Sequence, residues 1–126
     1  MKTLTKAEEQ IMQILWELKE CIVKNVVESF DEPRPAYTTV ATVLKVLEKK
    51  GFARHKKIGN THLFYPAISK KEYTHFQFSS LLKNYFNGSF PKMATFFAKQ
   101  NNLGIEELEE MLKITENELN KDNDSK

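Results

Sequence analysis

Two neighbouring groups of polar side chains near the middle of the sequence have the chemistry needed to contact a nucleic acid. The first group recurs at helical spacing and consists of Thr38, Thr39, Thr42 and Lys45. The second group surrounds a Gly-Asn dipeptide and consists of Lys57, Asn60, Thr61 and His62. Threonine can bond to a base edge or touch a thymine methyl group, and lysine can reach guanine acceptors or phosphate. The two groups therefore predict a DNA-binding surface, in which the first selects bases and the second holds the sugar-phosphate backbone.

Basic and acidic residues are concentrated in different segments of the chain, although the formal net charge is only +2. From Lys45 to Lys71 the sequence holds eight Lys or Arg residues and one acid, Glu48, whereas from Gln100 to Lys126 it holds three lysines and eight acids. A basic block can hold a polyanion through counterion release, and phosphate repels an acidic segment. A merely solvated surface is the ordinary alternative for a basic block taken alone. The DNA-binding prediction therefore depends on the elements that carry the block.

A helix that begins after Pro35 is predicted to present the threonines. Its apolar residues recur at i, i+3, i+4 and i+7, and they are Val40, Val43, Leu44 and Leu47. At ~100° per residue, the side opposite this stripe holds Thr38, Thr42, Lys45 and Lys49. One face then packs on a core while the other presents hydroxyl, methyl and ammonium groups. A plain surface helix is the alternative, but adjacent β-branched threonines lower helix propensity without an evident packing benefit.

Two further helices are expected before this one and a hairpin after it. Thr5 and Glu8 form a capping-box signal for a helix of roughly residues 5–20, and residues 21–30 form a shorter amphipathic helix. Gly51 ends the third helix, and strands of roughly residues 52–58 and 61–66 turn at Gly59-Asn60. Three helices followed by a hairpin form a winged helix-turn-helix, with the hairpin as the wing. The predicted fold class is therefore mostly α with a small β-hairpin.

Three segments resemble a known family. They read LTKAEEQIMQILW at residues 4–16, AYTTVATVLKVLEKKGF at 36–52 and YPAISKKEY at 65–73. These segments are similar to the opening helix, the recognition helix with its exit into the wing, and the wing-to-helix joint of the penicillinase-repressor family of BlaI and MecI type. The resemblance spans nearly the whole chain. It implies a dimeric bacterial transcriptional repressor that occupies a pseudopalindromic operator in double-stranded DNA and blocks transcription of adjacent genes.

The C-terminal half is expected to pair two copies of the chain. Eight of the 14 aromatic residues lie between Tyr73 and Phe97, more apolar area than three short helices can easily bury within one chain. The alternative is that these aromatics cover the winged domain. We expect a DNA-binding domain over residues 1–68 and a helical dimerisation domain over residues 69–126, with residues 120–126 frayed. The predicted dimerisation residues are Tyr73, Phe76, Leu81, Tyr85, Phe86, Leu108, Met111 and Leu112.

The resemblance also implies control of the pairing. In well-known relatives, a sensor-coupled protease cuts the dimerisation region at an Asn-Phe bond. The matching place in this chain holds Phe96 and Phe97, so the asparagine is absent. A different regulatory protease and a signal other than proteolysis both stay open. Copper-responsive members carry paired cysteines near the C-terminus, and the absence of any cysteine after Cys21 excludes metal sensing of that kind.

Enzymatic function is the main alternative class, and it would depend on Cys21, His55, His62 and His75. In the expected hairpin register His55 and His62 are not directly opposed, and we expect no Asp or Glu near them to complete a metal site. Cys21 lacks a nucleophile pattern and a disulfide or zinc partner. We therefore expect no enzyme, no cofactor and no metal.

A winged helix that docks on an acidic protein instead of DNA is a closer rival. Its basic hairpin would then contact carboxylates on the partner.

No apolar run is long enough for membrane insertion, and the N-terminus lacks the apolar core of a signal peptide, so a cytoplasmic protein is expected.

Overall fold

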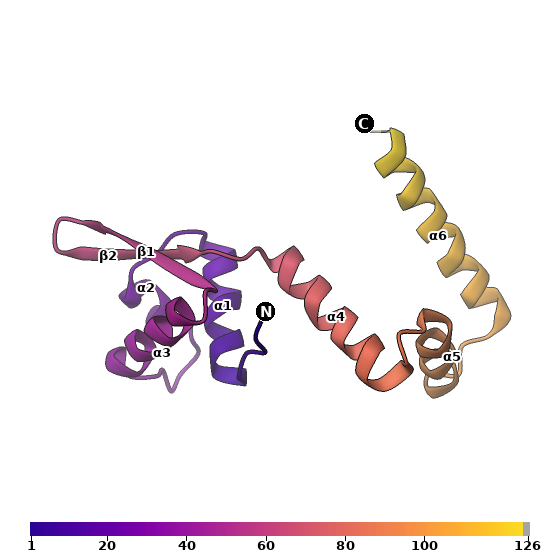
Figure 1. Ribbon diagram of the computed structural model, residues 1–126, viewed down its shortest axis with the longest axis horizontal. Helices are drawn as coiled ribbons and strands as arrows, with labels where there is room; N and C mark the ends of the chain where they lie inside the picture. Colours follow the sequence, from indigo (N-terminus) through magenta and orange to yellow (C-terminus); the bar gives the residue numbers. More distant parts are fainter. Residues whose placement is uncertain (125–126) are drawn as a thin grey trace. The chain divides into compact units, whose positions relative to one another are not determined.

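The chain divides into two compact units, Met1–Phe78 and Ser79–Lys126, and the computed structural model describes residues 1–124. Figure 1 shows the elements of the first unit, which are α1 (Lys6–Leu18), α2 (Val23–Glu28), α3 (Tyr37–Lys49), β1 (Ala53–Ile58), β2 (Thr61–Pro66) and the start of α4 (Lys70–Phe86). The second unit contains the rest of α4, α5 (Phe90–Gln100) and α6 (Ile105–Asp124). The chain is mostly helical with a small antiparallel hairpin, so the predicted winged helix-turn-helix is confirmed.

The core of the first unit collects one face of each of its elements. The side chains in it with essentially no exposed surface are Met12, Leu15, Val26, Val40, Leu44, Leu47 and Phe52. The apolar stripe predicted for α3 is confirmed, because Val40, Leu44 and Leu47 are fully buried and Val43 packs against the same cluster. This packing fixes which side of α3 faces outward.

Glu8 joins the start of α1 to the end of α3. The predicted capping box is confirmed, since the Thr5 N–H donates to Glu8 Oε1 at 2.8 Å and the Glu8 N–H donates to Thr5 Oγ1 at 3.2 Å. The Lys50 ammonium also donates to Glu8 Oε1 at 2.8 Å. Burial alone would raise the pKa of Glu8, but the hydrogen bonds from Lys50 and Thr5 outweigh it and hold the pKa below its ordinary value. The buried carboxylate is therefore ionised and paired at neutral pH.

The exit from α3 into the hairpin depends on two glycines. Gly51 has φ +87°, and the bonds from its N–H to the Glu48 carbonyl and from the Phe52 N–H to the Leu47 carbonyl form a Schellman motif. Gly59 has φ +63° at the first central position of the turn that joins β1 to β2. The predicted helix end and turn are confirmed at these positions.

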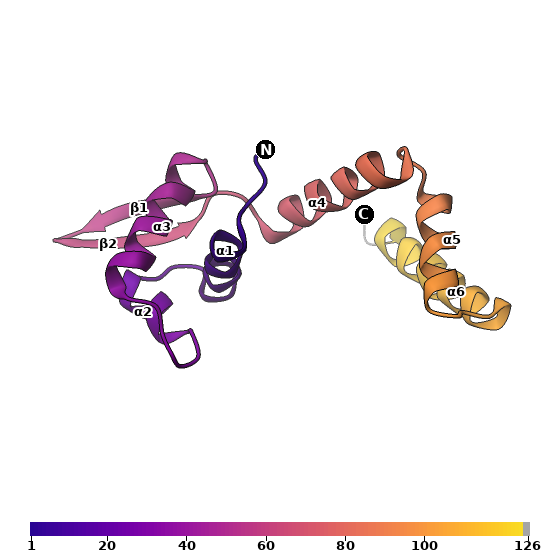
Figure 2. The same ribbon diagram turned by 90° about the horizontal axis from the view of Figure 1, so that it is seen from below.

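Three contacts fix the hairpin to the helices. The Cys21 N–H donates to the Phe64 carbonyl at 3.0 Å and the Phe64 N–H donates to the Cys21 carbonyl at 2.8 Å, so the residue before α2 adds a bridge to β2. The Trp16 indole N–H donates to the Ile68 carbonyl at 2.8 Å, just after β2. These bonds hold the base of the hairpin against α1 and α2, and Figures 1 and 2 both show α3 beside it.

The second unit consists of helices separated by short turns. Ser89 caps α5 by accepting from the Lys92 N–H at 3.2 Å, and Asn87 and Gly88 at positive φ end α4. Residues 101–104 separate α5 from α6. The expected fraying from residue 120 is wrong as far as residue 124, because α6 continues to Asp124, and the remainder of that segment lies outside the described residues. None of the described helices is both long and apolar enough to cross a membrane.

Candidate nucleic-acid interface

The outward face of α3 carries all four polar residues of the first predicted group. Thr38, Thr39, Thr42 and Lys45 are exposed. The face opposite them is the fully buried stripe of α3, so this helix cannot turn its polar side inward without emptying the core. The arrangement leaves a rigid helix with hydroxyl, methyl and ammonium groups toward solvent.

The Thr42 hydroxyl is already engaged within α3. Its Oγ1 donates to the Thr38 carbonyl at 2.9 Å, one turn earlier in the helix. The hydroxyl proton is therefore occupied, and the groups that remain for a ligand are the methyl group and the oxygen lone pairs. Thr42 is thus suited to touching a thymine methyl group or accepting from a base donor, rather than to donating.

One face of the hairpin lies toward the polar groups of α3. Lys57 pairs with His62 across the strands and His55 pairs with Phe64, so these four side chains share a face. Phe64 is 4% exposed and anchors this face in the core, whereas Lys57 and His62 are exposed. At the turn, Asn60 and Thr61 are also exposed. The hairpin therefore presents all four residues of the second predicted group to solvent.

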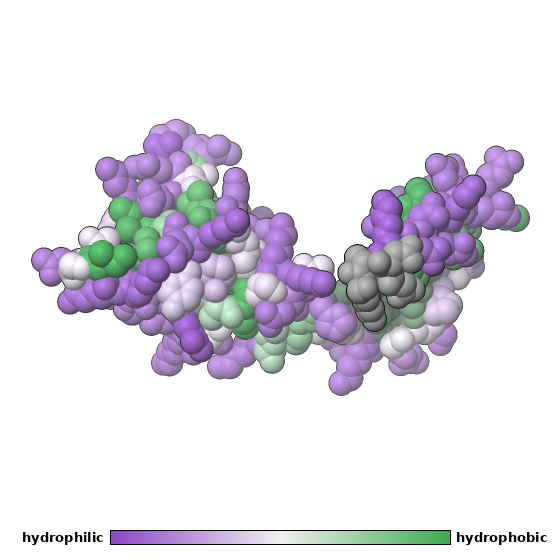
Figure 3. All heavy atoms as spheres, turned by 90° about the horizontal axis from the view of Figure 1, so that it is seen from above, coloured by the Kyte–Doolittle hydropathy of each residue, from purple (hydrophilic) through white to green (hydrophobic). Residues whose placement is uncertain are grey.

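The tip of the hairpin also exposes an apolar side chain. Ile58, directly before the turn, is 60% exposed. Figure 3 shows hydrophobic residues among hydrophilic ones at this end of the first unit, at the left of the view. An apolar tip flanked by Lys57 and Asn60 can contact sugars while its neighbours contact phosphates.

Two adjoining hollows lie between α3 and the hairpin. One, of about 380 Å³, is lined by Lys45, Glu48, Lys49, His55, His62 and Phe64. The other, of about 390 Å³, is lined by Val23, Tyr37, Ala41, Lys45, Asn60, Thr61, His62 and Phe64. Lys45, His62 and Phe64 line both. The two hollows form one groove over Phe64, which Lys45 of the first predicted group and Asn60, Thr61 and His62 of the second group line.

An acid that sequence reasoning missed lies in this groove. The expectation that no Asp or Glu approaches the hairpin histidines is wrong, because Glu48 Oε1 lies 2.6 Å from His55 Nδ1. The His55 ring in turn stacks on His62, with centroids 4.4 Å apart and planes 17° apart. The expectation that the two histidines are not directly opposed is confirmed by the register. Glu48 is the one acid between Lys45 and Lys71, and its isolation among basic residues is the sequence feature that could have identified it as a partner of a hairpin histidine.

An enzymatic function would depend on the histidines as metal ligands or on Cys21 as a nucleophile. No group of three or more His, Cys, Asp or Glu residues within them could hold a metal ion. Cys21 is 2% exposed, and burial raises the pKa of its thiol to about 11. A neutral, inaccessible thiol is a core residue and not a nucleophile at physiological pH.

The predicted dimerisation residues occupy two different environments. Tyr73 and Phe76 belong to the first unit, where Tyr73 is 4% exposed, packs against Trp16 and Phe52, and accepts from the Leu4 N–H at 3.4 Å. Phe86 is half-buried in the second unit, with its ring 5.6 Å from that of Phe96. The remaining predicted residues are exposed, and they are Leu81, Tyr85, Leu108, Met111 and Leu112.

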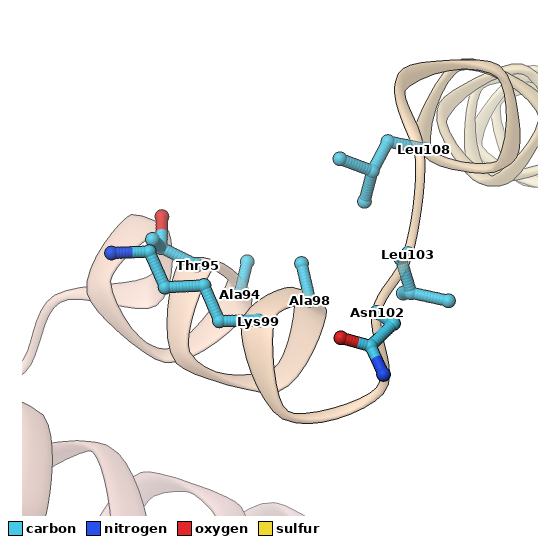
Figure 4. A pocket seen from close by; sticks show the side chains of 7 residues that line it. All are labelled: Ala94, Thr95, Ala98, Lys99, Asn102, Leu103 and Leu108. Carbon is cyan, nitrogen blue, oxygen red and sulfur yellow. The ribbon is translucent and has the colours of Figure 1, made fainter.

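The second unit also contains an open hollow of about 570 Å³ between α5 and the start of α6. Figure 4 shows the seven side chains that line it, which are Ala94, Thr95, Ala98, Lys99, Asn102, Leu103 and Leu108. Most of its lining is apolar and no charged pair closes it. The candidate cleavage residues, Phe96 and Phe97, lie on the same helix and are 54% and 53% exposed.

The chain matches one family model and several known proteins. A family model described as penicillinase repressor matches residues 4–117. The chain is similar to the penicillinase repressor of Bacillus licheniformis, with 26% identity over 94% of this chain and 93% of that protein. It is also similar to the methicillin resistance regulatory protein MecI of Mammaliicoccus sciuri, with 25% identity over 88% of this chain and 91% of that protein. A solved structure described as transcriptional regulator PA4135 aligns at 21% identity over 94% of this chain and 78% of that one, but a TM-score of 0.42 supports no conclusion.

Proposed function

The chain belongs to the penicillinase repressor family, and we propose that two copies of it bind a pseudopalindromic operator and block transcription. In this proposal α3 enters the major groove and the hairpin contacts the neighbouring backbone. The observation that carries the proposal is the exposed polar face of α3, which lies beside a basic hairpin and opposite a fully buried stripe. A helix of this kind is what a helix-turn-helix protein places against base edges.

The two predicted groups then have separate duties. Thr38, Thr39, Thr42 and Lys45 face bases or nearby phosphates in the major groove, and the threonines select the sequence. Lys57, Asn60, Thr61 and His62 contact phosphates and sugars, which gives affinity without sequence preference. The exposed state of all eight side chains supports this assignment.

The second unit supplies the pairing that a symmetric operator requires. Exposed apolar side chains on α4, α5 and α6 support a shared core between two copies, because water contact with so many of them is unfavourable in a single chain. The residues proposed for this interface are Leu81, Tyr85, Phe86, Leu108, Met111 and Leu112. Tyr73 is left out because its side chain is already buried in the first unit, and Phe76 is left out because it packs against the core of that unit.

Relief of repression would act on this pairing. If a protease acts between Phe96 and Phe97, the substrate bond lies inside α5, and the helix must unwind locally before an extended segment can enter an active site. α5 has no buried residue, so this unwinding disrupts little packing. A signal other than proteolysis would instead have to change the affinity of one second unit for another.

A salt titration on duplex DNA tests the proposed function. The full chain should select a symmetric duplex from a genomic pool, and its affinity should fall steeply with salt according to the number of phosphates contacted. Thr42→Ala should weaken the selected site more than random duplex, whereas Lys57→Ala should weaken both alike. Equal losses on both duplexes for both variants would contradict the assignment of base reading to α3.

The rival function, docking of the basic hairpin on an acidic protein, predicts a different result in the same experiment. In that case the chain would retain weak, salt-sensitive affinity for any polyanion, and no duplex would be enriched over bulk DNA. Enrichment of one symmetric sequence would therefore support operator binding over docking on an acidic protein.

A further inference from the structure

Two nitrogen-bearing side chains, one from α3 and one from the hairpin, line the whole groove between these elements. Lys45 comes from the exposed face of α3 and His62 from β2, and both line each of the two hollows that form the groove. Phe64, which is 4% exposed, closes the floor between them. An anion that enters the groove thus has a donor on each side and an apolar surface below.

The His62 ring is held in place by a chain of contacts that begins on α3. Glu48 Oε1 lies 2.6 Å from His55 Nδ1, so the carboxylate accepts from that nitrogen and fixes the His55 ring. His55 packs on Phe64 with centroids 5.3 Å apart and stacks on His62 at 4.4 Å. Glu48 on one element therefore sets the position of His62 on another.

The charges around His62 favour an anion. From α3 the groove receives Lys45, Lys49 and Glu48, and from β1 it receives His55. Lys57, also on β1, is the cross-strand partner of His62. Glu48 is the only acid among them, and its near oxygen is occupied by His55. The open positions are thus cationic or become so on protonation.

We propose that Lys45 and His62 form one phosphate-binding position in this groove, and that His55 and Glu48 are positioning residues for the His62 ring. The inference rests on the proposed DNA-binding function and assigns a backbone phosphate to a defined pair of side chains. A strand of the duplex would pass between α3 and the hairpin, with that phosphate above Phe64.

This position makes DNA affinity depend on pH. Histidine changes its charge between about pH 5 and pH 8, and a phosphate oxygen is bound far better by the charged ring than by the neutral one. A phosphate bound at this position therefore favours the charged form of the His62 ring over the neutral form. Affinity for duplex falls as pH rises, and the effective number of neutralised phosphates falls by about one, because each contact contributes roughly 0.9 to the salt slope.

The experiment measures the salt dependence of duplex affinity for the full chain at about pH 6 and about pH 8, across the range in which histidine titrates. The slope of the logarithm of the binding constant against the logarithm of the salt concentration should be steeper by about one for wild type at the lower pH. His62→Gln should show the same shallow slope at both pH values. His62→Lys should show the steep slope at both, because its charge does not titrate in this range. His55→Ala should retain only part of the difference, since the His62 ring loses its support.

His75→Gln is the matched control. His75 is exposed on α4, within the first unit but outside the groove, so this variant should keep the full difference between the two pH values. His62 is exposed as well, and its substitution should leave the melting temperature unchanged.

The outcomes separate this inference from the proposed function. Wild type that binds a selected duplex with equal slopes at both pH values overturns the phosphate position and leaves the repressor function standing. A pH difference that persists in His62→Gln also overturns it. A full chain that prefers no duplex at either pH overturns both.

Discussion

The two units of the chain differ in how much of their apolar side chains they bury. In the first unit, Val26, Leu44 and Phe52 have no exposed surface, and Trp16 and Tyr73 close the cluster around them. In the second unit, Tyr85 is 76% exposed and Leu112 is 60% exposed, and α5 has no buried residue at all. The buried core thus lies in the first unit, and none of residues 79–122 is buried.

This difference follows from how the apolar residues are distributed over the elements. Each helix of the first unit has one apolar stripe, and the strands close over the stripes through Phe52 and Phe64. Among the described residues from Ser79 onward, eleven large apolar side chains are exposed. A unit of 48 residues that leaves so many uncovered ordinarily needs a partner to be stable. The division of duties proposed above, with DNA contact in one unit and pairing in the other, has its physical origin here.

The comparison is tested most severely by removing one large side chain from each unit. Phe52→Ala should lower the free energy of unfolding of the first unit by about 3–5 kcal/mol, because the ring is fully buried. Phe97→Ala, in a chain kept monomeric by a second substitution, should change the free energy of unfolding of the second unit by less than about 1 kcal/mol, because the Phe97 side chain is exposed. Urea denaturation followed by circular dichroism measures both. Equal costs would mean that the second unit has a core of its own.

Pairing should be lost when a charge is placed on the apolar face of α6. Leu112→Glu should convert the full chain to a monomer and weaken binding to a symmetric operator by about 100-fold, the loss expected when two linked half-sites become independent. Lys113→Glu changes the charge at the neighbouring position and should leave the dimer intact. Sedimentation and operator titration give the two readouts, and a dimer that survives Leu112→Glu would remove α6 from the interface.

The ion pair between Glu8 and Lys50 should make the free energy of unfolding of the first unit depend on pH. Lys50→Met leaves the buried Glu8 carboxylate without its cation and should cost about 2 kcal/mol at neutral pH. The folded state lowers the pKa of Glu8, so the contribution of the pair is fully present above the ordinary pKa of a glutamate and is lost as pH falls through the lowered pKa. The cost of Lys50→Met should therefore shrink on acidification. A cost that is the same at neutral pH and at about pH 3 would contradict this account.

The smallest expected effect concerns Thr42. Since its hydroxyl proton is bound to the Thr38 carbonyl, the methyl group should carry most of the base contact. Thr42→Ser removes only the methyl group and should lower affinity for the selected operator by about fivefold, near 1 kcal/mol, whereas Thr42→Val keeps it and should change affinity less. Competition binding against random duplex measures the difference. The reverse order would assign recognition to the hydroxyl.

Local patterns predicted the elements of the first unit but not the contacts between them. The stripe on α3, the capping box at Thr5 and the turn at Gly59 each depend on residues close in sequence, and all three are present. The contact of Glu48 with His55 depends on how the last turn of α3 meets β1, and helix and strand periodicity carry no information on that meeting.

The place of Tyr73 illustrates the same limit. Its position in a run of aromatics suggested pairing, but the first turns of α4 pack on Trp16 and Phe52, far away in the sequence. The first unit consequently continues to Phe78. The extension of α6 to Asp124 was missed for a local reason, since polar residues near its end give no apolar periodicity.

Sedimentation velocity tests the division between the two units most directly. At micromolar concentration and without DNA, the full chain should sediment with twice its mass of 14.7 kDa, and a chain that ends at Phe78 should remain folded and sediment as a monomer. A full chain that is monomeric under these conditions, or a shortened chain that still pairs, would contradict the account.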